Sequence, residues 1–293
     1  MTKIAVYGEV LDQKHYKSIE GFFGQMRNFE MEFVIYDKYK KIVESIVEFK
    51  SEVKTFKNKE ELQNLNVDFL VSIGGDGTML NSFRLVFKSD IPVFGINTGR
   101  LGFLSNISTD KVKWALNEIM SGRTKTTGRS VLEITYDGQE EEIFAVNEVA
   151  IHKQDTSSML TVHAKLNNSD LNSYWADGIL VSTPTGSTAY SLSCGGPIVI
   201  PGSENFLITP IAPHNLAVRP LIYSDAGVIE FAVESRSQKF LLAFDSSSMT
   251  LPVGNKILVK KAPFSVSLLQ FEDYNYLDLL RNKLMWGADK RNW

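Results

Sequence analysis

The chain has 293 residues, of which 43% are hydrophobic and 22% charged, with a formal net charge of −3 at pH 7. This balance is typical of a globular protein large enough for two domains. It argues against binding to nucleic acid or to an anionic membrane, because basic residues are not in excess. We find no signal peptide, no long apolar run and a single cysteine, Cys194. We therefore expect a cytoplasmic protein without disulfides or membrane spans.

Strand and helix patterns alternate through residues 1–123, which we predict to form the first domain. The near-continuous apolar run VDFLVSI is typical of a parallel strand covered on both faces. The alternation favours a Rossmann-like, open and mostly parallel α/β sheet. The predicted strands lie at 3–10, 31–36, 67–73 and 91–96, and the predicted helices at 15–28, 40–49, 78–88 and 109–121.

The pattern changes after residue 123. From Arg129 onward, short runs alternate between apolar and polar residues and are separated by Asp-Gly, Asn-Asn and Pro-Gly turn signals. They predict a mainly antiparallel β domain over residues 124–275. The stretch 276–286 is helical in pattern, and we expect residues 276–293 to pack on the first domain or on a partner subunit.

The sharpest chemical signal is the sequence GGDGT at Gly74–Thr78, between the strand predicted at 67–73 and a helix start. Three glycines let the backbone approach a polyphosphate closely, and the helix start attracts the same anion. A carboxylate inside such a cradle is repelled by its ligand unless it binds Mg²⁺ or accepts a proton from an attacking hydroxyl group. Asp76 is therefore the candidate base. A tight turn with a solvated aspartate is the alternative interpretation.

Two further segments suit the polar parts of a nucleotide. Residues 178–197 follow Asp177, carry no charged side chain and are rich in hydroxyls and glycines, which favours neutral hydrogen bonding to ribose, amide and phosphate groups. Asn147 and Glu148 end an apolar run, where they could hold the two hydroxyls of a ribose. Arg100 could neutralise phosphate. Each feature has an alternative interpretation. Residues 178–197 could be a loop closed by ordinary turns, Asn147 and Glu148 could form an exposed strand end, and Arg100 could belong to a structural ion pair.

Together these segments resemble the NAD kinase family. The resemblance rests on GGDGT at 74–78, INTGRLGFL at 96–104, the Asn147-Glu148 pair and the glycine- and hydroxyl-rich segment 177–197. GGDGT alone also occurs in lipid kinases, and a close variant occurs in phosphofructokinases. The four segments in this order are much more specific, so we expect an enzyme that phosphorylates NAD to NADP.

The resemblance also implies site roles, with the active site between the two domains. Asp76 would be the base that activates the 2′-hydroxyl of the adenosine ribose of NAD, and Asp177 would lie near the nicotinamide end. ATP phosphates, carrying Mg²⁺ as a bridging ion without a direct protein ligand, would contact Gly74, Gly75, Gly77, Thr78 and Arg100. NAD would be bound by Asn147, Glu148, Asp177, Thr185, Thr188, Ala189, Tyr190 and Ser193.

The resemblance further implies a homodimer or homotetramer. It leaves open whether ATP or inorganic polyphosphate is the donor and whether NADH is accepted beside NAD. The segment Phe244–Ser247 departs from the Asp-Gly-Gln of many bacterial members, so its role is open.

Two other classes of function compete with this one. The first is a kinase for lipids or sugar phosphates, which the polar segment 177–197 and the single glycine-rich phosphate loop argue against. The second is a non-catalytic NAD(P)-binding sensor. A pure binder gains nothing from a carboxylate beside phosphate, so Asp76 argues against it.

Overall fold

The computed structural model describes residues 2–10, 12–49, 52–99, 101–105, 107–154, 158–272 and 274–285. The chain forms two compact units, one of Met1–Gly128 with Val266–Trp293 and one of Arg129–Ser265. Residues 266–275, which the sequence analysis placed in the second domain, thus belong to the first unit.

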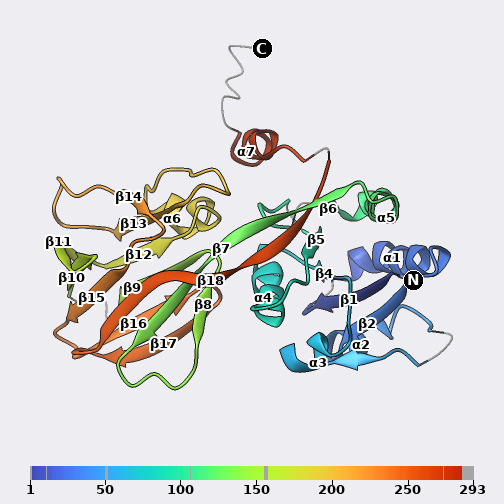
Figure 1. Cartoon of the computed structure of the whole chain (residues 1–293), viewed down its shortest axis with the longest axis horizontal. Helices are drawn as coiled ribbons and strands as arrows, with labels where there is room; N and C mark the ends of the chain where they lie inside the picture. The colour runs from blue at the N-terminus through green and yellow to red at the C-terminus, as the bar shows by residue number, and fades with distance from the viewer. Residues whose placement is uncertain are drawn as a thin grey trace, which may run out of the picture. The chain divides into compact units, whose positions relative to one another are not determined.

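The first unit contains a parallel sheet (Figure 1). Its strands are β1 (Lys3–Gly8), β2 (Glu32–Tyr36), β3 (Thr55–Phe56), β4 (Phe69–Ile73), β5 (Val93–Asn97) and β6 (Ile107–Ser108). The order is β3-β2-β1-β4-β5, with β6 beside β5. Val6 stands opposite both Ile35 and Val71 in the parallel register. The long strand β18 (Lys256–Phe271) ends in this unit, where Leu268 pairs with Val93.

The first unit also contains helices. They are α1 (Tyr16–Asn28), which follows the short η1 (Gln13–His15), then α2 (Asp37–Val43), α3 (Lys59–Gln63), α4 (Asp76–Val86), η2 (Thr109–Lys111), α5 (Val112–Met120) and α7 (Tyr276–Leu284). Phe22 and Phe23 of α1 and Leu116 of α5 share one core with Val6 and Val71. Strand β4 is buried at every position, and α4 packs against β4 and β5. A continuous apolar strand is stable only when both faces are covered in this way.

The second unit consists mainly of antiparallel strands (Figure 1). One sheet has the order β14-β13-β12-β9-β16-β17, and a second series runs β11-β10-β15-β18. The bounds are β7 (Thr124–Tyr136), β8 (Ile143–Ala145), β9 (Glu148–Lys153), β10 (Leu160–Leu166), β11 (Ser169–Ala176), β12 (Gly178–Ser182), β13 (Asn205–Ile211), β14 (Leu221–Ser224), β15 (Ile229–Glu234), β16 (Lys239–Phe244) and β17 (Ser247–Pro252), with the short helices η3 (Gly186–Thr188) and α6 (Tyr190–Ser193) after β12.

Both series of strands contribute to a single hydrophobic core. Val149 and Phe240 of the first sheet lie in the same buried cluster as Val162 and Phe231 of the second. Along these strands, successive side chains alternate between this core and the outer face, as expected when two sheets pack face to face.

The predicted fold class is confirmed, with local differences at helix ends. The helix expected at 40–49 is the shorter α2, which ends at Val43. Beyond it, Ser45 and Ile46 N–H bond to the carbonyls of Ile42 and Val43, three positions back, so the chain tightens into a turn. Asn58 caps α3, which the sequence analysis did not predict, by accepting from Glu61 N–H. The helix predicted at 276–286 is α7, and Trp286 lies outside the described residues. In the part of the chain that the structure describes, no helix is long and apolar enough to cross a membrane.

Candidate active site

The GGDGT segment lies where the structure turns from β4 into α4. Gly75 is the N-cap of α4 and supplies no side-chain cap, and Asp76 is the first helical residue. A Cβ on Gly74 would collide with the side chain of Thr78, so only glycine fits there. The first N–H groups of a helix have no partner within it and point outward with the positive end of the helix dipole. The turn thus presents donors of the kind that bind phosphate.

The Asp76 carboxylate is held by three consecutive backbone N–H groups. Phe103 N–H donates to Oδ2 at 2.8 Å, while Leu104 and Ser105 N–H donate to Oδ1 at 3.1 and 2.9 Å. These charge-assisted bonds fix the direction of the carboxylate. A carboxylate has about four lone-pair positions. Among the described residues, the remaining position is on Oδ2, where it could accept a proton.

The loop after β5 is shaped to deliver these donors. Asn97 accepts from Gly99 N–H at 2.7 Å and donates to the Ser105 carbonyl at 3.0 Å. Ser105 Oγ donates to the Gly74 carbonyl at 3.0 Å, which ties the loop to the GGDGT turn. A Cβ on Gly102 would collide with Asp76 Oδ1. The INTGRLGFL segment therefore surrounds the candidate base. Arg100, the predicted phosphate ligand in this segment, lies outside the described residues.

In the second unit, Asn147 and Glu148 lie at the start of β9, where a carboxylate holds their backbone. Asp245 accepts from the N–H groups of Val146, Asn147 and Glu148 at 2.8, 2.8 and 3.3 Å. Asp245 adopts a left-handed φ of 46° between β16 and β17, a conformation that aspartate and asparagine tolerate better than most residues. Each unit thus contains an aspartate carboxylate that accepts from three successive backbone N–H groups.

The hydroxyl-rich segment after β12 packs directly on Asn147. Thr183 N–H donates to the Asn147 carbonyl at 2.9 Å, and Thr183 Oγ1 donates to the Val146 carbonyl at 2.6 Å. A Cβ on Gly186 would collide with the Asn147 carbonyl oxygen, so the close approach requires glycine. Of the residues predicted here, Thr185 is buried, Thr188 and Ala189 are partly buried, and Tyr190 and Ser193 are exposed.

Glu148 is the most perturbed acid of this group. Burial, followed by the negative charge of Asp245, raises the pKa of Glu148 to about 8, although a hydrogen bond from Tyr190 N–H opposes the shift. Within the described residues, Glu148 Oε2 is buried and has no hydrogen-bond partner. A buried polar atom without a partner is costly, and a ligand hydroxyl would supply what is missing.

Asp177 and Tyr190 also lie in this neighbourhood. The Tyr190 ring is 5.6 Å from the ring of His152, centroid to centroid. Asp177 pairs with Lys153 at 2.6 Å and acts electrostatically on His152 and Tyr190. The predicted residues of the second unit are therefore brought together by the fold. His152, Lys153 and Asp245 were not predicted, and only the departure noted at 244–247 pointed to Asp245.

Two family models match the sequence. The ATP-NAD kinase N-terminal domain matches residues 10–124 and the ATP-NAD kinase C-terminal domain matches residues 146–271. The chain belongs to the NAD kinase family. The recognition of this family, the fold class and the NAD kinase activity predicted from sequence are thereby confirmed.

Relatives match over nearly the whole chain. An NAD kinase of Cytophaga hutchinsonii is 42% identical over 291 residues, which cover 98% of this chain and 99% of that protein. An NAD kinase of Christiangramia forsetii is 40% identical over 301 residues, which cover 99% of this chain and 100% of that protein.

Solved structures of NAD kinases share the fold. Yeast NADH kinase, in a complex with NADH, has a TM-score of 0.86 at 25% identity and covers 99% of this chain and 89% of that chain. An NAD kinase from Archaeoglobus fulgidus, in a complex with ATP, has a TM-score of 0.73 at 26% identity. It covers 97% of this chain and 99% of that chain.

Proposed function

We propose that this NAD kinase transfers the γ-phosphoryl group of ATP to the 2′-hydroxyl of the adenosine ribose of NAD, with Asp76 as the general base. The observation that carries the role of Asp76 is its carboxylate, which backbone N–H groups of Phe103, Leu104 and Ser105 hold in place. Within the described part of the chain, these bonds leave one acceptor position on Oδ2. Proton acceptance by a positioned carboxylate is what a sugar hydroxyl needs in order to attack phosphorus.

The donor phosphates, in this proposal, bind at the start of α4. Gly74, Gly75, Gly77 and Thr78 surround a helix N-terminus that lacks a side-chain cap. Mg²⁺ would accompany ATP and offset the negative charge of its phosphates, and the proposal assigns it no ligand from this chain. In the described ranges, no group of three or more His, Cys, Asp or Glu side chains could together hold a metal ion.

NAD, in this proposal, binds to the second unit. Glu148 is protonated near neutral pH, because burial and Asp245 raise its pKa to about 8, so it can donate one hydrogen bond and accept another. A ribose diol requires both roles from its partner. Asn147, Thr185, Thr188, Ala189, Tyr190 and Ser193 complete the pocket, with Asp177 toward the nicotinamide.

We also infer that the chain acts in the cytoplasm as a homodimer or homotetramer. Support for self-association comes from β14, an edge strand with exposed Leu221 and Ile222, and from Leu216, which is 88% exposed. Exposed apolar side chains beside an open strand edge are typical of subunit interfaces. Light scattering of the purified protein tests this inference, and a monomer at micromolar concentration would contradict it.

The activity is tested by an NADP-forming assay coupled to an NADP-specific dehydrogenase. We expect NADP formation with MgATP and NAD, and the same assay with inorganic polyphosphate or with NADH decides the donor and acceptor range. Binding of NAD without any product would favour a sensor. Phosphorylation of lipids or sugar phosphates alone, in a parallel panel with labelled ATP, would favour the other kinases.

A further inference from the structure

Helix α7 contacts the loop that carries the donors to Asp76. Lys283 Nζ donates to the Leu101 carbonyl and lies 5.6 Å from the centroid of the Phe103 ring. The ring of Tyr276 lies 6.5 Å from that of Phe103, with the two planes at 47°. Tyr276 and Lys283 are seven positions apart and thus share one face of the helix. That face of α7 is therefore attached to the loop at Leu101 and Phe103.

The contacted residues are directly connected to the candidate base. Phe103 is the first of the three consecutive residues whose N–H groups bind the Asp76 carboxylate, and its own bond is 2.8 Å long. Gly102, between Leu101 and Phe103, is buried and leaves no space for a Cβ beside Asp76 Oδ1. Because this approach is so close, a small shift of the loop changes the direction of the carboxylate.

We propose that Lys283 is a positioning residue for Asp76 and acts through Phe103. Its ammonium group contacts the carbonyl of Leu101 and the ring of Phe103, on either side of Gly102. These two contacts hold the N–H groups of residues 103–105 in place. In this proposal, Lys283 makes no direct contact with substrate or phosphate. The inference rests on the proposed role of Asp76 as the base, because it assigns to α7 the task of keeping that base aimed.

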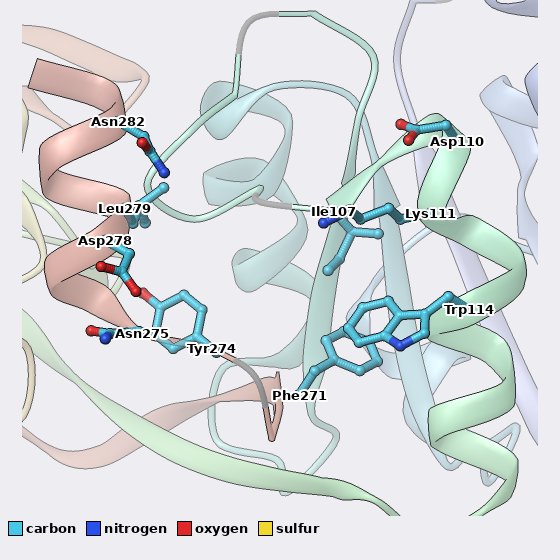
Figure 2. Close-up of a pocket in the computed structure, with 10 residues that line it drawn as sticks. All are labelled: Ile107, Asp110, Lys111, Trp114, Phe271, Tyr274, Asn275, Asp278, Leu279 and Asn282. Carbon is cyan, nitrogen blue, oxygen red and sulfur yellow. The ribbon is translucent and has the colours of Figure 1, made fainter. Parts of the chain in front are cut away.

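The other side of α7 provides matched controls. A pocket of about 520 Å³ is lined by Asp278 and Asn282 of α7 on one side and by Trp114 and Phe271 on the other. Figure 2 shows these residues around the pocket. Asn282 is one position away from Lys283 in sequence and therefore lies about 100° from it around the helix axis. Arg281 is exposed and bonds to Asp278 at 2.8 Å, within the same helix. Variants at Asn282 and Arg281 therefore disturb α7 without removing its contact with the loop.

The test is the steady-state kinetics of the full-length enzyme with MgATP and NAD. We expect Lys283→Ala to lower kcat roughly tenfold, since small misplacements of reacting groups cost up to about a hundredfold. KM for NAD and the melting temperature should remain near wild type. Lys283→Arg should recover most of kcat, because a guanidinium can make both the carbonyl and the ring contact. Arg281→Ala and Asn282→Ala should be near wild type.

A double-mutant cycle adds a second test. Phe103→Leu keeps the backbone N–H that binds Asp76 but removes the ring, so its effect on kcat should not add to that of Lys283→Ala. Additive effects, an equal loss in Arg281→Ala, or a wild-type kcat in Lys283→Ala would overturn the proposal. If the proposed function itself were wrong, the wild-type enzyme would form no NADP or Asp76→Asn would remain fully active, and neither result depends on Lys283.

Discussion

The carboxylate of Asp245 lies 2.8 Å from the backbone nitrogen of Asn147, 98 positions away in the chain. The same carboxylate accepts from Val146 and Glu148. A turn at the end of β16 thereby fixes the backbone of the Asn147-Glu148 pair. Its negative charge also contributes to the raised pKa of Glu148. One aspartate thus fixes the geometry of the proposed ribose site and adds to the effect of burial on the pKa of Glu148.

Replacing Asp245 with Asn should weaken NAD binding more than it slows turnover. Asparagine tolerates the left-handed backbone at this position but offers one acceptor oxygen instead of two, so at least one N–H loses its partner. We expect the free energy of unfolding to fall by about 1–3 kcal/mol and KM for NAD to rise while kcat changes little. Asp137→Asn, at an exposed turn of the same unit, is the control for charge removal. A KM equal to that of wild type would separate Asp245 from the NAD site.

Replacing Asp76 with Asn should abolish most of the turnover. Removal of a general base typically lowers kcat by about 10²–10⁴-fold. The variant keeps one acceptor oxygen for the N–H groups of residues 103–105, so thermal denaturation must be measured beside the kinetics. We expect a folded protein with an unchanged dissociation constant for NAD by calorimetry. Near-wild-type kinetics would exclude Asp76 as the base.

Adding a methyl group at Gly102 should displace the carboxylate of Asp76 without changing Asp76 itself. The Cβ of Gly102→Ala would collide with Asp76 Oδ1, so the loop or the carboxylate must move. We expect kcat to fall at least tenfold, on the order seen when reacting groups are misplaced by about 1 Å. Gly99→Ala is the matched control, because among the described residues its Cβ would meet only Asn97 Oδ1, at 3.8 Å. An equal kcat in Gly102→Ala and Gly99→Ala would contradict the close contact between Gly102 and Asp76.

The buried Glu148 should make stability depend on pH. Its pKa is raised in the folded state from 4.5 to about 8, so the folded protein keeps a proton that the unfolded chain releases. The resulting stabilisation is complete below about pH 4.5 and is lost as the pH rises to about 8, with a total of a few kcal/mol at most. We expect Glu148→Gln, which cannot ionise, to lose less stability than wild type between pH 5 and pH 9. Urea denaturation at each pH measures the difference, and parallel pH profiles would refute the assignment.

The sequence was sufficient for the features that local patterns encode. Alternating strand and helix periods predicted the α/β unit, and short alternating runs predicted the β unit. Three glycines around Asp76, between an apolar run and a helix start, located the turn from β4 into α4. These predictions succeeded because hydrophobic periodicity and backbone freedom are properties of neighbouring residues. The catalytic and binding roles of the individual side chains remain predictions.

The tertiary structure alone decided which groups hold the site residues in place. The donors to Asp76 come from 27 to 29 positions further along the chain, and Asp245 reaches back over 97 to 99 positions. Such bonds join a side chain to backbone groups of a distant segment, and backbone groups are the same in every residue, so no sequence pattern marks the partner. The burial that raises the pKa of Glu148 likewise results from packing between strands, which exists only in the folded chain.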